Sequence, residues 1–209
     1  MLFVMGFLTM FVLGGISGVM LAMIPLTIHV SDTYFIVAHI HYVLFGGSLF
    51  TIFAGVYYWF PKMTGRMYDE KLGKLHFWST FVFFNATFAP MHLIGIQGMP
   101  RRVFDYADQF ANWNLFISIA SFFLGMSSLV FLYNMVASWR GGPRAEANPW
   151  NALTLEWQVS SPPPIFNFDH IPTVVGGPYE YGVPGAVHGI FKPAEETVAS
   201  SSETEKAQA

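Results

Sequence analysis

Residues 31–60 read SDTYFIVAHIHYVLFGGSLFTIFAGVYYWF. After Asp32 this stretch contains no Asp, Glu, Lys or Arg, and it exceeds the roughly 20 helical residues that cross a bilayer core. It therefore predicts a transmembrane helix over about residues 33–60, with Ser31 or Asp32 capping its N-terminus. Two histidines, His39 and His41, lie inside this apolar run, and their role is the main question that the sequence raises.

Three further apolar segments are long enough to span a membrane, at about residues 1–24, 75–97 and 113–138. Hydrophobic residues make up 53% of the chain and charged residues only 11%, whereas soluble domains carry roughly a quarter charged residues. The sequence thus predicts an all-α membrane protein with four transmembrane helices. No Lys or Arg precedes the first segment, unlike a secretory signal, so we expect that segment to span the membrane. Without cysteine, disulfides and thiolate metal sites are excluded.

The composition changes after Trp139. Residues 1–139 hold the four predicted helices, whereas residues 140–209 are rich in Gly, Pro, Asn and Ser and predict an extended tail. The final segment AEETVASSSETEKAQA, 194–209, is expected to be disordered. Cations near helix ends favour the cytoplasmic side. The connection after the second helix and the start of the tail are therefore expected in the cytoplasm, because they carry Lys62, Arg66, Lys71, Lys74, Arg140 and Arg144.

The spacing of the two histidines determines what they can bind. Helical residues advance by about 100° each, so His39 and His41 differ by about 200° and point to opposite faces. They cannot bind one metal ion together, as histidines four positions apart can. Histidine inside a membrane helix is uncommon and generally functional, and neutral imidazole is an axial haem ligand. We expect one haem on each side of the helix, with the irons on the order of 12 Å apart.

Residue chemistry alone leaves three alternatives. The histidines could form hydrogen bonds with neighbouring helices. The chain could be a cytochrome b-like dihaem electron carrier, but such a carrier needs histidine pairs on two facing helices, which the spacing of His39 and His41 does not provide. It could also be a structural or transport bundle without haem, and purified material would then show no haem absorbance.

Three motifs resemble subunit I of the haem–copper oxygen reductase family, which includes cytochrome c oxidase. They are SDTYFIVAHIHYVLFGG at 31–47, YYWFPKMTGRMYDEKLGKLHF at 57–77 and PMHLIGIQGMPRRVFDYAD at 90–108. The similarity extends from residue 1 to about residue 168 and implies that the four helices are the last four of a twelve-helix bundle. It also implies a terminal oxidase that transfers electrons from cytochrome c through a low-spin haem A to a haem–copper centre, reducing oxygen to water coupled to proton pumping. A quinol oxidase of the same family would differ in its electron donor.

The resemblance assigns roles to individual residues. It implies that His39 is the axial ligand of the high-spin haem, where oxygen reacts, and that His41 is one of two axial ligands of the low-spin haem. Arg101 and Arg102 follow the third helix on the expected outer side, against the usual distribution of cations, and would pair with haem propionates. Otherwise they would extend to lipid headgroups. His92 either contacts a haem edge or propionate, or serves only in packing.

The resemblance further implies a Mg or Mn ion at the outer side, held partly by Asp32. Ser31 stands where the family usually has a histidine, and Thr27 where an aspartate is common, so His29 would have to compensate. Alternatively, Asp32 is only a helix cap. Three other histidines are placed in the inner loop or the tail and are given no functional role, namely His76, His170 and His188.

Several groups that the resemblance implies have no counterpart in this sequence. They are a second axial histidine, three copper ligands with a nearby tyrosine, and the Glu and Lys of the proton channels, so copper is expected only in the complete subunit. We expect the remaining N-terminal part of subunit I to come from another chain or from an upstream reading frame. Subunits II and III, cytochrome c and membrane lipid are the other expected partners, and nucleic acid is not. The expected location is the bacterial plasma membrane, with the mitochondrial inner membrane as the alternative, and the chain alone is expected to be unstable and inactive.

Overall fold

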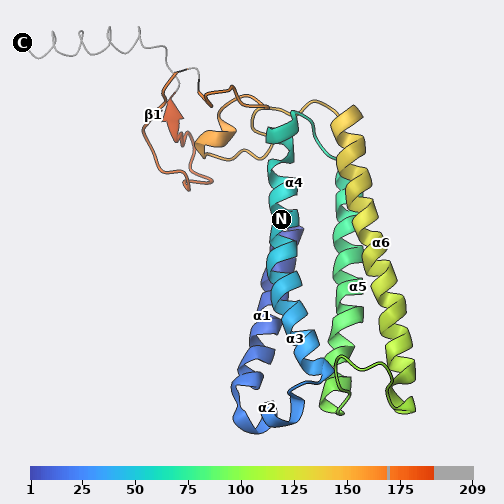
Figure 1. Ribbon diagram of the computed structural model, residues 1–209. Helices are drawn as coiled ribbons and strands as arrows, with labels where there is room; N and C mark the ends of the chain where they lie inside the picture. The colour runs from blue at the N-terminus through green and yellow to red at the C-terminus, as the bar shows by residue number, and fades with distance from the viewer. Residues whose placement is uncertain (169, 191–209) are drawn as a thin grey trace, which may run out of the picture. The chain divides into compact units, whose positions relative to one another are not determined.

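The computed structural model describes residues 1–168 and 170–190. Within these residues, four helices are long and apolar enough to cross a membrane, over Leu2–Ala22, Tyr34–Thr64, Glu70–Ile96 and Asp108–Gly141. This confirms the predicted all-α membrane fold. Figure 1 shows the corresponding helices α1 (Leu2–Ala22), α3 (Tyr34–Leu44), α4 (Phe50–Thr64), α5 (Glu70–Ile96) and α6 (Ala111–Gly141) running side by side, with the short α2 (Ile24–Val30) joining α1 to α3.

The second membrane-spanning helix begins at a different cap from the one predicted. The N-cap of α3 is Thr33, whose hydroxyl accepts a hydrogen bond from the Phe35 N–H at 3.2 Å and donates one to the Val30 carbonyl at 2.7 Å. The Ser31 hydroxyl instead donates to the Thr27 carbonyl at 2.6 Å, and the Asp32 carboxylate pairs with Arg101. The expectation that Ser31 or Asp32 caps this helix is therefore wrong, because both side chains bond elsewhere.

A π-helical turn, η1 (Phe45–Leu49), joins α3 to α4 within this span. The N–H of Phe50 donates to the Phe45 carbonyl, five residues earlier, instead of four as in an α-helix. Such turns hold one extra residue and are frequent at functional sites.

The connection between α4 and α5 is shorter than predicted. Helix α4 continues through Pro61 to Thr64 and stops at Gly65, which has φ +70, a conformation that favours glycine. Helix α5 begins at Glu70 because the Asp69 carboxylate accepts from the Leu72 N–H at 2.9 Å.

His76 therefore lies inside α5, not in a loop, and the prediction that placed it in the inner loop is wrong. Its ring is fully buried, and its Nδ1 lies 3.1 Å from the Tyr57 hydroxyl. Aromatic rings surround it, with centroids 4.6–5.2 Å away, from Phe3, Phe53 and Phe131.

Helix α5 packs against both α6 and α3, while α1 packs against α3. Helix α5 comes close to α3 at Gly95, where an added Cβ would lie 2.7 Å from the Phe35 Cα. At Gly46, an added Cβ would lie 3.3 Å from the Met10 Cγ of α1. Small residues thus allow close helix contacts, as is common in membrane bundles. Buried aromatic rings fill the interior between these helices.

Residues 59–67 and the described residues from 142 to 190 form a second compact unit. Its backbone is largely irregular, with a 3-10 turn, η3 (Leu155–Trp157), and one short antiparallel pair, β1 (Thr173–Val174) and β2 (Gly189–Ile190). This unit differs from the predicted tail, 140–209, in that it includes the end of α4. The predicted disorder of 194–209 falls outside the described residues.

Candidate functional site

His39 is turned toward α1. Its Nδ1 lies 2.9 Å from the Ser17 hydroxyl and 3.1 Å from the Gly14 carbonyl. Gly18 leaves room for the ring, since a Cβ there would lie 3.1 Å from the His39 Cε1. The His39 ring therefore rests on a row of small residues in the first helix. The run of small residues GGISG at 14–18 is the signal in the sequence for this contact, which was not predicted.

His41 is turned toward α5. Its ring stacks on Phe88, with centroids 4.3 Å apart and an interplanar angle of 14°. Its Nδ1 lies 2.7 Å from the Val37 carbonyl, one turn earlier in the same helix. The two histidines thus contact different helices, as their spacing predicts.

The partners of both rings fix the nitrogen that is free to bind a metal. A backbone carbonyl only accepts hydrogen bonds, so Nδ1 of His39 and Nδ1 of His41 each donate when they bond to Gly14 and Val37. In the neutral ring, the lone pair then lies on Nε2. A hydrogen bond at one ring nitrogen that orients the other for metal binding is the usual arrangement of histidine ligands. Both histidines therefore fit axial haem ligation.

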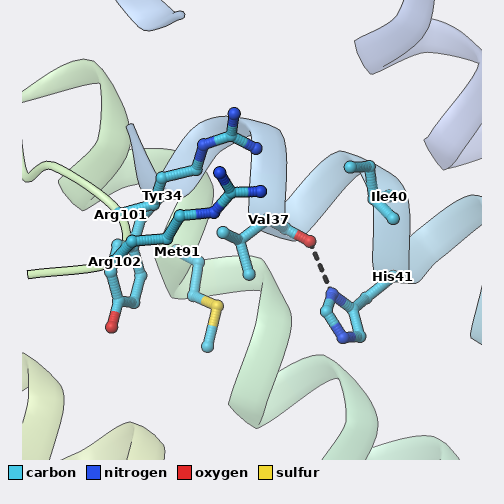
Figure 2. A pocket seen from close by; sticks show the side chains of 7 residues that line it. All are labelled: Tyr34, Val37, Ile40, His41, Met91, Arg101 and Arg102. Atoms are coloured by element: carbon cyan, nitrogen blue, oxygen red, sulfur yellow. Dashed lines mark hydrogen bonds between the residues drawn. The ribbon is translucent and has the colours of Figure 1, made fainter. Parts of the chain in front are cut away.

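A cavity of about 270 Å³ lies beside His41. Figure 2 shows its lining, with the guanidinium groups of Arg101 and Arg102 on one side of Val37 and the His41 ring on the other. Tyr34, Ile40 and Met91 complete the lining. The cavity thus combines an imidazole, apolar walls and two cations, which suits a flat apolar ligand that carries carboxylates.

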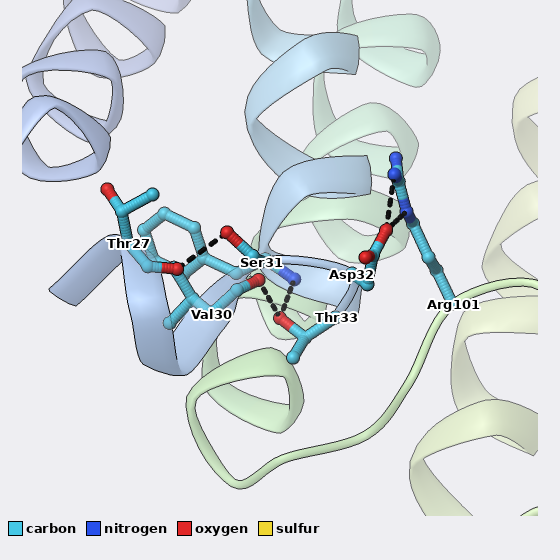
Figure 3. A network of polar contacts seen from close by, with 7 residues as sticks. Thr27, Val30, Ser31, Asp32, Thr33 and Arg101 are labelled. Atoms are coloured by element: carbon cyan, nitrogen blue, oxygen red, sulfur yellow. Dashed lines mark hydrogen bonds and ion pairs between the residues drawn. The ribbon is translucent and has the colours of Figure 1, made fainter. Parts of the chain in front are cut away.

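Arg101 is held in place by two sets of contacts. Its Nε and Nη2 both donate to Oδ1 of Asp32, at 3.0 and 2.6 Å, as Figure 3 shows. Its backbone N–H also donates to the Asp32 carbonyl at 2.9 Å, next to an antiparallel bridge between Thr33 and Pro100. Since the Asp32 side chain is 81% exposed, the ion pair orients Arg101 more than it stabilises the fold. Arg102 makes no ion pair among the described residues.

The two residues predicted to hold a metal ion, His29 and Asp32, do not form a complete site. His29 and Asp32 are both exposed, and the described residues contain no group of three or more His, Cys, Asp or Glu side chains that could hold an ion. A Mg or Mn ion here would need ligands beyond the described residues, and the prediction for His29 and Asp32 stays a prediction.

His92 packs against α3. Its ring lies edge-to-face with Phe35 at 5.0 Å and tilted against Tyr42 at 5.4 Å. Its Nε2 is buried and has no hydrogen-bond partner among the described residues. The structure therefore shows the packing contacts of His92 and leaves its Nε2 available to a further group.

Comparisons with known proteins match this chain to one family. A family model described as Cytochrome C and Quinol oxidase polypeptide I matches residues 1–123. Cytochrome c oxidase subunit 1 of Thermostichus vulcanus is 56% identical over 183 residues, 88% of this chain and 33% of that protein. The proteins of the same name from Synechocystis sp. and Corynebacterium diphtheriae are 52% and 51% identical, over 88% and 83% of this chain. The chain spans about a third of the length of these relatives.

Proposed function

Because the chain belongs to the cytochrome c and quinol oxidase polypeptide I family, we propose that it is the haem-bearing C-terminal part of the catalytic subunit of a terminal oxidase. In the complete enzyme, electrons from cytochrome c would pass through low-spin haem A to a high-spin haem A and copper centre that reduces oxygen to water, coupled to proton pumping. Haem and copper supply that chemistry when they are bound, and the residues of this chain provide ligation, orientation and charge.

The observation that carries the proposal is that two imidazoles on one helix contact different neighbouring helices, α1 for His39 and α5 for His41. His39 would hold the high-spin haem and His41 the low-spin haem, each through Nε2, because a backbone carbonyl engages each Nδ1. Helix α3 would then separate the two groups and fix their mutual orientation. The fold supports this arrangement by packing α1 behind His39 and α5 behind His41.

Arg101 and Arg102 would bind the propionates of the low-spin haem. They line the cavity beside His41, and guanidinium forms two-pronged, charge-assisted hydrogen bonds with carboxylates. The Asp32 carboxylate would orient Arg101, and with His29 it would contribute to a Mg or Mn ion completed by a partner subunit. The remaining part of subunit I, which supplies the copper ligands, and subunits II and III complete the proposed complex in a bacterial plasma membrane.

The electron donor is cytochrome c in this proposal, because the relatives named above are cytochrome c oxidases. The family also includes quinol oxidases, so a quinol is the alternative donor. Oxygen consumption by the purified complex, measured with reduced cytochrome c and with a quinol, separates the two. Faster turnover with the quinol would contradict the choice of cytochrome c.

Spectra of the histidine variants test the haem assignment. The protein is purified with its copurifying subunits, and reduced-minus-oxidised spectra are recorded with and without carbon monoxide. His41→Ala is expected to remove the low-spin signal and to keep the carbon monoxide-reactive one, and His39→Ala is expected to do the reverse. His170→Asn, in the exposed tail, is the control and keeps both. Both signals surviving in both alanine variants would disprove the assignment.

A further inference from the structure

Lys62 is a buried cation outside the proposed haem site. Only 6% of the residue is exposed, and among the described residues it forms no ion pair. A buried ammonium is costly unless its hydrogen bonds are satisfied. Its surroundings therefore have to replace the water that it has lost.

Three backbone carbonyls surround the ammonium group. The Lys62 Nζ donates to the carbonyl oxygens of Ala147 at 2.9 Å, Val159 at 2.8 Å and Ser160 at 3.3 Å. An ammonium has three N–H donors, so each can be matched by one acceptor. We call these three groups the carbonyl cage. Carbonyl oxygens that replace a hydration shell are also how proteins bind K⁺.

An aromatic ring adds to the carbonyl cage. The Nζ of Lys62 lies 4.9 Å from the centroid of the Trp157 ring, a distance at which the ring attracts a cation. Trp157 is fully buried and belongs to the turn η3 (Leu155–Trp157). This turn lies between the two parts of the tail that supply the carbonyls.

The carbonyl cage joins segments that are distant in the sequence. Ala147 lies 85 residues from Lys62, whereas Val159 and Ser160 lie 97 and 98 residues away. Nearby, Arg66 Nη1 donates to the Gly142 carbonyl at 2.6 Å, and the Ala145 N–H donates to the Gly65 carbonyl at 2.9 Å. Lys62 is the most buried charge in this set of contacts.

We propose that Lys62 is an internal cation that holds tail residues 145–161 against the end of α4. We further propose that the carbonyl cage binds a small alkylammonium ion when the Lys62 side chain is shortened. The function of Lys62 would then be to complete a cation site built from the tail, independently of any haem. The proposal does not depend on the terminal oxidase function.

The unaltered protein gives the first test. The purified complex is treated briefly with an amine-reactive acetylating reagent, and the labelled lysines are identified by mass spectrometry. Lys62 is expected to react at least about tenfold more slowly than the exposed Lys71 and Lys74, because labelling requires the carbonyl cage to open. Equal labelling rates would overturn the proposal, whatever the variants do.

Two variants separate charge from packing. Lys62→Met keeps the aliphatic stem and removes the charge, whereas Lys62→Ala removes both. Both are expected to increase hydrogen–deuterium exchange of residues 145–160 by about tenfold or more, because hydrogen bonds to a charged group are lost. Lys71→Ala is the matched control and leaves that exchange unchanged. Wild-type protection in Lys62→Met would show that packing alone holds the tail, and it would overturn the proposal.

Chemical rescue tests the cation site itself. In Lys62→Ala, millimolar n-propylammonium is expected to restore slow exchange in residues 145–160, while n-propanol at the same concentration has no effect. The two compounds match in length and differ in charge. Rescue by both, or by neither, would overturn the cation site. Exchange in α5 around Phe84 serves as the internal reference for a folded bundle.

Discussion

His39 and His41 are held by different helices although only one residue separates them. His39 bonds to Ser17 and Gly14 of α1, whereas His41 stacks on Phe88 of α5. Each ring also directs its Nδ1 to a backbone carbonyl. Changes in α1 and changes in α5 are therefore expected to affect the two proposed haem sites separately.

Gly18→Ala is expected to disturb the His39 site alone. The new Cβ would lie 3.1 Å from the His39 Cε1, so the ring would have to move by a few tenths of an ångström. Disturbed support of a histidine ligand typically weakens binding by about 10–100-fold. The carbon monoxide difference spectrum of the purified complex should therefore lose intensity while the low-spin signal persists. Gly15→Ala, which has nothing within 4 Å of its added Cβ, is the control, and equal spectra for both variants would contradict this prediction.

If the proposed low-spin haem lies beside Arg101, Arg101→Gln and Asp32→Asn are expected to shift its potential in opposite directions. A nearby cation favours reduced haem, which carries one positive charge fewer, so loss of Arg101 lowers the midpoint potential. Loss of the Asp32 charge raises it. For partly exposed charges we expect shifts on the order of tens of millivolts, measured by spectroelectrochemical titration. Glu70→Gln, at the other end of α5, should leave the potential unchanged, and shifts of the same sign in both test variants would refute the charge argument.

Gly95→Ala is expected to force α3 and α5 apart. Its Cβ would lie 2.7 Å from the Phe35 Cα, and backbone cannot move aside as a flexible side chain can. Overpacking of this kind costs about 1–3 kcal/mol or more, so the thermal unfolding temperature of the complex should fall. Gly125→Ala in α6 has open space around its Cβ and should be neutral or slightly stabilising. An unfolding temperature for Gly95→Ala equal to that of the wild type would argue against this close approach.

Tyr57→Phe is expected to destabilise the bundle around the buried His76 of α5. The change removes the hydrogen bond to the His76 Nδ1, and the His76 Nε2 already lacks a partner among the described residues. A buried polar group left unsatisfied costs about 1–3 kcal/mol. Denaturant unfolding of the bundle, followed by circular dichroism, measures this cost. Tyr133→Phe, at a residue that is 66% exposed, is the comparison, and equal midpoints for the two variants would disprove the role of the bond.

Hydropathy and helical geometry predicted the main features of this chain. The four spans follow from apolar length alone, and the divergence of His39 and His41 follows from the advance of about 100° per residue. The identity of the residue that caps α3 did not follow from hydropathy or helical geometry. Ser31, Asp32 and Thr33 are all able to cap a helix, and the choice depends on Arg101, which lies 69 residues from Asp32.

Two features had no local signature in the sequence. The loop assigned to His76 conflicts with the predicted apolar segment 75–97, which includes this residue, and the helix itself begins earlier still, at the Asp69 cap, which apolar content does not reveal. The partners of Lys62 are backbone carbonyls. Every residue has a backbone carbonyl, whatever its side chain. Only the tertiary arrangement of the tail distinguishes these three acceptors from all others.

The π-turn at Phe45–Leu49 has a consequence for tolerated changes in chain length. Because one wide turn absorbs a surplus residue, deletion of a single residue there should produce an ordinary α-helix in which Phe50, Phe53 and Tyr57 still face inward. A one-residue deletion between Tyr34 and His39 would instead rotate both imidazoles by about 100° about the helix axis relative to the N-terminal end of α3. Single-residue deletions that preserve the packed bundle are therefore expected to fall at Gly46–Ser48.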